Sequence, residues 1–317
     1  MATIHVEDWA GTYGSPYLVL SDDAGSEAAH LVEDGDRLLT HAVLRADGPH
    51  RPLAFVDGVR RIEAALYRFE TGSGRMARAL AGSHACGAVI ADCDRRATFG
   101  HERVRRLLIC GGDLPFEIPT IRGGWNWDSR SIHGDDPEVL KGQLQLRMRQ
   151  EEGALAEHLC AEGHLVVMDG PLHYVRSRDL PVMGYVKTHS RALLGPEHHR
   201  ELPGLRPGER SSLFSIGERY SCYLRLAPGS AIAGPWSGIV RLEVPESAGL
   251  PAAVRVVDQA TAILPRYAGV AHLDPRAPQN LQPVGALERR LRHLLGDPGL
   301  AYRAVREAVA RLADGKD

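Results

Sequence analysis

The sequence LVVMDG occupies residues 165–170, and the similar sequence LAFVDG occupies residues 53–58. Each begins with four apolar residues, and an apolar run of this length that ends at a turn residue predicts a buried strand. Each continues with Asp-Gly, so Asp57 and Asp169 are predicted at the ends of rigid strands, where the following glycine lets a ligand approach closely. If the two strands lie side by side, the two carboxylates repel each other unless a divalent cation lies between them. The pair therefore outlines a metal site.

These Asp-Gly pairs have an alternative interpretation, because Asp-Gly after an apolar run is also the usual signal for a hairpin turn. Residues 62–67 form a second run of strand character after Asp57-Gly58, so a hairpin is predicted there. Residues 85–91 supply a third apolar run, and the three runs together predict an antiparallel meander. From the residues alone, both the turn and the site remain open.

The remainder of the chain alternates between helical and strand patterns. Leucine and methionine residues at helical spacing across residues 137–161, without an internal proline, predict a long helix that leads into the strand at 165–168. Further strands are predicted at 182–187, 220–226 and 238–244, helices at 252–264, 286–295 and 301–312, a helix or strand at 103–109, and a long loop at 111–136. This order predicts an α/β fold in which helices flank a mixed sheet. Residues 1–50 are predicted to form a small β-containing leader, and residues 51–317 a single domain.

The composition is that of an ordinary globular chain. Of 317 residues, 44% are hydrophobic and 25% are charged, which excludes disorder, collagen and coiled coil as descriptions of the whole chain. Lys and Arg number 38 and Asp and Glu number 40, so binding to nucleic acid would require a local basic groove. Five cysteines without a C-x-x-C pair argue against a zinc ribbon and favour a reducing compartment. With no signal peptide and no run of about 18 apolar residues, a cytoplasmic protein without membrane spans is predicted.

A third acidic candidate lies in the helix predicted at 137–161. Glu152 precedes Asp169 by 17 residues, which is enough for the helix to end and the next strand to return beside it. A glutamate in the middle of a helix is usually a solvated surface residue. Glu151 is its neighbour, so composition alone distinguishes neither glutamate as a site residue.

The strand with Asp57, the helix with Glu152, the sequence DGPL at 169–172 and the sequence GYVKT at 184–188 together resemble the NurA nucleases. The resemblance extends from about residue 50 to about residue 295. It implies an RNase H-like fold, in which a mixed sheet flanked by helices carries acidic residues that hold Mn²⁺ or Mg²⁺. It also implies a deoxyribonuclease that acts in DNA end resection and repair, forms a homodimer and works with the hexameric ATPase HerA.

Matched residue by residue, the resemblance assigns the catalytic and metal-binding positions of the family to Asp57, Glu152 and Asp169. Glu151 is the alternative for the helix position, because a shift of one residue would exchange the two glutamates. The implied chemistry is hydrolysis of a phosphodiester assisted by two metal ions. Carboxylates suit this role, because Mn²⁺ and Mg²⁺ prefer oxygen ligands.

Four further residues are candidates for DNA contacts. The resemblance places a family lysine on Lys187, and a lysine or arginine near the site, such as Lys187 or Arg60, can bind backbone phosphate. The alternative for both is an ordinary solvated position on the surface. Trp125 and Trp127 alternate in a Gly-rich stretch and could stack on unpaired bases or dock a partner protein, or they could be buried structural residues.

The chain departs from the family near its C-terminus. The family has a Tyr-Pro segment that ends in Ala-His, and that Tyr and His belong to the active site. Here residues 272–285 read HLDPRAPQNLQPVG, so Asp274 stands near the position of the Tyr and no His occupies the later position. A second hypothesis is therefore a catalytically degraded adaptor or clamp that links DNA to a HerA-like translocase. A third is a hydrolase of RNA or of small phosphoesters on the same fold.

Overall fold

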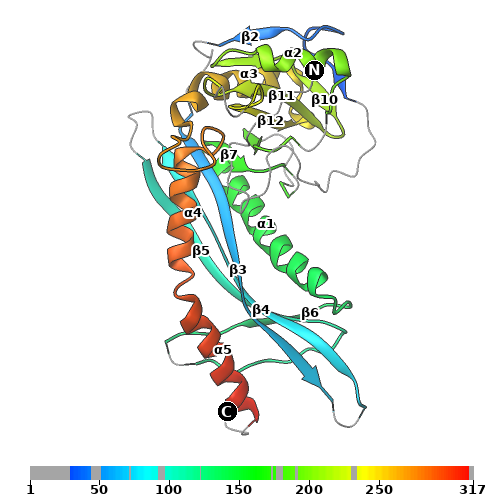
Figure 1. Ribbon diagram of the computed structural model, residues 1–317, viewed down its shortest axis with the longest axis vertical. Coiled ribbons are helices and arrows are strands. Elements are labelled where there is room, and N and C mark those ends of the chain that lie inside the picture. The colour runs from blue at the N-terminus through cyan, green and yellow to red at the C-terminus, as the bar shows by residue number, and fades with distance from the viewer. Residues whose placement is uncertain are drawn as a thin grey trace. The chain divides into compact units, whose positions relative to one another are not determined.

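The computed structural model describes residues 29–43, 51–70, 73–91, 97–121, 123–172, 174–175, 181–189, 192–229 and 234–313. Most of the predicted leader, residues 1–28 and 44–50, lies outside these ranges. Within them, a large mixed sheet is flanked by helices (Figure 1), which confirms the predicted α/β fold. None of the described helices is long and apolar enough to cross a lipid bilayer.

The described residues form twelve strands in one sheet and five α-helices. The strands are β1 (His30–Leu31), β2 (Thr40–Ala42), β3 (Leu53–Phe69), β4 (Met76–Ala91), β5 (Ala97–Cys110), β6 (Asp128–Ser131), β7 (Leu165–Asp169), β8 (Val182–Val186), β9 (Glu209–Ser211), β10 (Phe214–Ile216), β11 (Arg219–Arg225) and β12 (Ile239–Pro245). The helices are α1 (Pro137–Ala161), α2 (Pro196–Glu201), α3 (Leu250–Ile263), α4 (Gln282–Leu294) and α5 (Pro298–Ala313). Hydrogen bonds join the strands in the order β1-β10-β11-β12-β8-β7-β3-β4-β5-β6, and β9 pairs with both β11 and β2.

The chain divides into two compact units. The first unit comprises Met1–Val56, Val89–Thr98 and Ala156–Ala286. The second unit comprises Asp57–Ala88, Phe99–Leu155 and Leu287–Asp317. Elements β3, β4, β5, α1 and α4 contribute residues to both units.

In the second unit, helices cover both faces of the long strands. Leu107 and Ile109 of β5 pack in one apolar cluster with residues of α1, whereas Leu108 and Cys110 pack in another with residues of α5. Successive side chains of a strand point to opposite faces, so α1 and α5 lie on opposite sides of this part of the sheet (Figure 1). Each buried aliphatic side chain in these layers contributes about 1.5–3 kcal/mol relative to an exposed one.

In the first unit, the central strands are parallel and buried. Residues 53–56 at the start of β3 pair in parallel with β7, and β7 pairs in parallel with β8. Strands in this position are covered on both faces, which explains why the sequence shows uninterrupted apolar runs there rather than alternation. Helix α3 packs against β11 and β12 and buries Ala253, Val257 and Ala260 at helical spacing.

The predicted hairpin at Asp57-Gly58 is wrong, because β3 runs without a break from Leu53 to Phe69. Asp-Gly marks a turn where the segments on either side pair with each other, but residues 53–56 pair instead with β7, which lies more than 100 residues later. Asp57 is therefore an interior strand residue. The predicted third strand at 85–91 is part of β4, the ambiguous segment 103–109 is part of strand β5, and the predicted loop at 111–136 contains β6.

A histidine enclosed by aromatic rings in the first unit predicts a pH dependence of stability. The ring of His189 packs against Tyr223 and Trp236, with centroid distances of 5.6 and 5.1 Å, and its Nε2 lies 3.0 Å from the carbonyl oxygen of Ile239. Burial lowers the pKa of His189 to about 4. The unfolded histidine, with a pKa of about 6.5, takes up a proton at a pH where the folded one remains neutral.

The free energy of unfolding is therefore expected to fall by as much as about 3 kcal/mol through His189 as the pH is lowered from about 6.5 to about 4. Urea denaturation at several pH values between 4 and 7 measures this. The variant His189→Gln should lose the corresponding part of the slope, because glutamine does not titrate. Equal slopes for the two proteins would contradict the prediction.

Candidate metal centre

The strand that ends in Asp169 is held in register by its neighbours in the first unit. Val56 of β3 lies opposite Met168 of β7, and Asp169 lies opposite Tyr185 of β8. Beyond Asp169, Gly170 has a φ of 106° and still exchanges two backbone hydrogen bonds with Tyr185, at 2.9 and 3.1 Å. Glycine adopts this left-handed conformation without strain, so the chain leaves the strand sharply while Asp169 stays fixed.

The Asp169 carboxylate is bonded to Lys187. The Lys187 ammonium donates to Oδ2 of Asp169 at 2.6 Å and to Oδ1 of Asn280 at 2.9 Å. The Lys187 side chain is only 10% exposed, so the alternative of a solvated surface lysine is wrong. Burial, followed by the charge of Asp169, raises the pKa of the neighbouring Tyr185. Its hydroxyl donates to the carbonyl oxygen of Gln279 at 2.6 Å.

A buried glutamate holds the loop that follows Asp169. Oε2 of Glu243 accepts from the backbone N–H of Leu172 at 3.2 Å, and its two oxygens also accept from Arg241 at 2.6 Å and Arg219 at 3.1 Å. Burial raises the pKa of Glu243, but the two arginines and the Leu172 N–H outweigh this and lower it below its usual value. The sequence DGPL at 169–172 is thus fixed by a charged network beneath it.

In the second unit, Asp57 lies close to a glutamate that the sequence analysis did not assign to the site. Asp57 is 5% exposed and Glu288 of α4 is 6% exposed. Their carboxylate oxygens lie within 4.8 Å of each other. The sequence signal for Glu288 is its position on the buried face of α4, four residues after Val284 and three before Leu291. A glutamate on an otherwise apolar, buried helix face is a candidate for a functional residue.

Glu152 is also buried, at 1% exposure, so the alternative of a solvated surface glutamate is wrong. It continues the apolar stripe of α1 that includes Leu144, Met148 and Leu155, and Arg149 donates to its Oε2 at 2.8 Å. Its Oε1 occupies the space beside Gly58, where a side chain on residue 58 would lie. Because side chains alternate along a strand, residue 58 faces Glu152 while Asp57 points to the other side of β3.

Glu151 has a different environment in the second unit. Its carboxylate lies 3.6 Å from Nε of Arg105 and 3.8 Å from Sγ of Cys86, and its side chain is 30% exposed. Burial, with smaller contributions from Glu151 and Glu152, raises the pKa of Cys86 to about 12, so this thiol stays protonated. Of the two helix glutamates, Glu152 is therefore the one enclosed against β3.

The contact between Glu152 and Gly58 predicts that Gly58→Ala destabilises the protein. A Cβ at residue 58 would overlap Oε1 of Glu152 and approach Cγ of Met148 to 2.9 Å. Because Glu152 is buried and held by Arg149, we expect a loss of about 1–3 kcal/mol in the free energy of unfolding, measured by urea denaturation. Gly100→Ala in β5 is the matched control, since nothing lies within 4 Å of a Cβ there. An unchanged midpoint for Gly58→Ala would contradict the close packing.

The remaining candidates for DNA contacts lie elsewhere in the second unit. Nε of Arg60 donates to Oε1 of Gln145 on α1, and the contact of Arg60 with DNA stays a prediction. Trp127 is buried in the apolar cluster that packs against α5, which agrees with the alternative of a buried structural residue. Trp125 stacks on Trp127 with a centroid distance of 6.1 Å, and the guanidinium of Arg106 lies 4.4 Å from the centre of the Trp125 ring. Both indoles are thus engaged within the fold.

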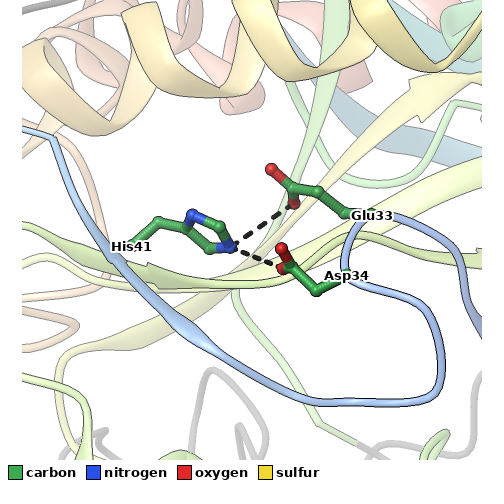
Figure 2. A group of neighbouring side chains, drawn as sticks. All are labelled: Glu33, Asp34 and His41. Atoms are coloured by element: carbon green, nitrogen blue, oxygen red, sulfur yellow. Dashed lines mark hydrogen bonds and ion pairs between the residues drawn. The ribbon is translucent and has the colours of Figure 1, made fainter.

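A second group of possible ligands, Glu33, Asp34 and His41, lies in the first unit, with the three ligand atoms within 4.8 Å of one another (Figure 2). Arg210 donates to both oxygens of Glu33 at 2.7 Å, Ser212 donates to Asp34 at 2.6 Å, and His41 lies 2.8 Å from Asp34. These hydrogen bonds account for the closeness of the group. It acts as a brace that holds residues 33–41 on β9.

No protein-family model and no curated protein sequence matches this chain. Among solved structures, it is similar to the crystal structure of the NurA nuclease from Sulfolobus solfataricus, with a TM-score of 0.42 and 10% sequence identity over 78% of this chain and 80% of that chain. Membership of the NurA family therefore stays a prediction from the sequence.

Proposed function

We propose that this chain is a nuclease that hydrolyses DNA phosphodiesters with the help of divalent cations. The observation that carries the proposal is the pair of buried carboxylates, Asp57 and Glu288, with oxygens within 4.8 Å of each other. Two anions this close repel each other and require positive charge nearby, part of which comes from Arg292, whose Nη2 lies 3.5 Å from Oε2 of Glu288. A bound Mn²⁺ or Mg²⁺ would convert this repulsion into attraction.

We propose Asp169 as a further ligand and retain Glu152 as the helix carboxylate assigned from the sequence. The pairing of Val56 with Met168 supports the first assignment, because Asp57 and Asp169 are the residues that follow this pair in two parallel strands. Glu152 is buried beside Gly58, on the face of β3 opposite to Asp57, so the second assignment rests on the sequence resemblance alone. All four candidate ligands are carboxylates, which suits hard cations better than Zn²⁺.

The side chains have separate tasks in this proposal. When bound, the cations would polarise the phosphate and activate a water molecule. Asp57, Asp169 and Glu288 would hold them on strand and helix residues that burial keeps rigid. Lys187 would keep Asp169 oriented and place positive charge near the phosphate, and Arg60 would bind the DNA backbone farther along.

We also propose that the protein acts on DNA ends as a homodimer together with a HerA-like hexameric ATPase. This part rests on the sequence resemblance. The catalytically degraded adaptor is the competing proposal, motivated by Asp274 and the missing His. The closeness of two buried carboxylates, Asp57 and Glu288, supports hydrolysis over the adaptor, because oxygen ligands grouped in this way suit a divalent cation.

Removal of the metal tests the proposal. With 5′-labelled single- and double-stranded DNA, cleavage in Mn²⁺ or Mg²⁺ should fall by about 100-fold or more in EDTA and return when the cation is restored. Mn²⁺ at about 100 times its dissociation constant should also stabilise the fold by about 2.7 kcal/mol, measured as a rise in melting temperature. Labelled RNA is the control for substrate class.

Two results would overturn the proposal. Cleavage that persists in EDTA would exclude the metal-dependent mechanism. An absence of both cleavage and Mn²⁺-induced stabilisation, with the HerA-like partner present, would favour the adaptor.

A further inference from the structure

Four polar side chains form a continuous hydrogen-bonded chain in the first unit, from Asp274 through Asn280 and Lys187 to Asp169. Nδ2 of Asn280 donates to Oδ2 of Asp274 at 2.6 Å. Oδ1 of Asn280 accepts from Lys187 at 2.9 Å, and Lys187 donates to Oδ2 of Asp169 at 2.6 Å. Both ends of the Asn280 amide are therefore engaged, which fixes its orientation. Lys187 is held between an amide oxygen and a carboxylate oxygen.

At its Asp274 end, the series of hydrogen-bonded side chains is held by contacts within one loop. Asp274 accepts from the backbone N–H of Arg276 at 2.8 Å and pairs with the Arg276 guanidinium at 3.2 Å. Burial raises the pKa of Asp274, but these contacts and the Asn280 amide lower it below its usual value, so Asp274 stays ionised. The backbone N–H of Asn280 donates in turn to the carbonyl oxygen of Arg276 at 2.9 Å. The loop thus presents Asn280 in one position.

Burial makes these four polar side chains costly to the fold unless each one is hydrogen-bonded. Asn280 is 1% exposed, and the side chains of Lys187, Asp169 and Asp274 are mostly covered. A buried polar network is favourable only when every member is satisfied, and apolar residues of similar volume often stabilise a fold equally well. The series of hydrogen bonds ends at Asp169, the carboxylate at the end of β7. Polar partners behind a metal ligand commonly set its orientation and the affinity of the site.

We propose that Asn280 and Asp274 are positioning residues that orient Lys187 and, through it, the Asp169 carboxylate for cation binding and DNA cleavage. This inference rests on the proposed nuclease function. Neither residue touches the reacting atoms. Asn280 supplies an acceptor to Lys187 and a donor to Asp274, so the order of donors and acceptors along the chain is what matters.

The test reverses that order. Asn280→Asp places a carboxylate against Asp274 and is expected to lower kcat about 10- to 100-fold while KM for DNA stays unchanged. Adding Asp274→Asn restores a donor facing an acceptor and keeps the net charge, so the double variant should recover to within about threefold of the wild type. Gln282→Glu, the corresponding change from amide to carboxylate at an exposed position two residues away, is the matched control and should leave kcat unaltered.

A binding measurement separates this inference from the proposed function. Asn280→Leu removes both hydrogen bonds and should weaken Mn²⁺ binding, measured by titration calorimetry of the folded full-length protein, by about 10-fold. If the wild type binds Mn²⁺ and cleaves DNA, and Asn280→Leu does both equally well, the inference is overturned and the nuclease stands. If Asn280→Leu binds Mn²⁺ more weakly but no variant or wild type cleaves DNA, the positioning role stands and the nuclease falls. If the wild type does not bind Mn²⁺, both fall.

Discussion

Asp57→Asn is expected to lower the rate of DNA cleavage by about 10³-fold or more at saturating Mn²⁺, because it removes one ligand charge from the proposed site. Asparagine has nearly the volume of aspartate, so the packing of β3 is preserved. The substitution also removes the repulsion between Asp57 and Glu288, whose oxygens lie within 4.8 Å. The metal-free variant should therefore be as stable as the wild type or more stable, by about 1 kcal/mol.

Companion variants sharpen this result. Glu288→Gln should lose cleavage as Asp57→Asn does, because the two carboxylates are neighbours in the second unit. Glu152→Gln tests whether the helix carboxylate, which lies on the Gly58 side of β3, also contributes to cleavage. Glu138→Gln, at an exposed position on the same helix, should have no effect. Cleavage of labelled DNA measures the rate, and urea denaturation measures the free energy of unfolding. Wild-type activity in Asp57→Asn would eliminate the proposed site.

Arg210→Met is expected to lower the free energy of unfolding by about 3–5 kcal/mol, the largest effect on stability that we expect. The Arg210 side chain is 1% exposed, and it donates to both oxygens of Glu33 and to Asp258, each at 2.7 Å. Removal of the guanidinium leaves the largely buried carboxylate of Glu33 without its compensating charge, and an unpaired buried charge costs far more than a lost surface contact. Urea denaturation at pH 7 measures the change.

Two variants control for this effect. Arg311→Met breaks an exposed pair with Glu307 at 2.5 Å and should change the free energy of unfolding by less than about 0.5 kcal/mol. The double variant Arg210→Met with Glu33→Gln should recover part of the loss, because no uncompensated charge remains at residue 33. A loss below about 1 kcal/mol in Arg210→Met alone would show that the network carries little of the stability.

Long periodic patterns in the sequence were sufficient to predict most of the elements. The helix predicted at 137–161 coincides with α1, because apolar residues recur at helical spacing from Leu140 to Leu159 and no internal proline interrupts them. The turn at Asp57-Gly58 was predicted wrongly, since a two-residue signal is weaker than the pairing of residues 53–56 with a strand distant in the sequence. Only the tertiary fold decides which segment a strand pairs with.

The candidate site was accessible from the sequence only in part. Asp57 and Asp169 were identified because each follows an apolar run, and Glu152 through the family resemblance. Glu288 was not assigned to the site, because adjacent arginines obscured its position on the buried stripe of α4. The partnership of Asn280 with Lys187 has no local signal at all, since 93 residues separate the two.

The ion pairs between Glu33 and Arg210 join residues that lie 177 positions apart. At translation rates of about 5–20 residues per second, the segment that carries β1 and β2 emerges from the ribosome about 10–35 s before its partner strands are synthesised. During that interval its backbone hydrogen-bonding groups are open to chaperones or to neighbouring nascent chains. Slow decoding within this stretch would lengthen the exposure, whereas rapid elongation would protect the nascent protein from misassembly.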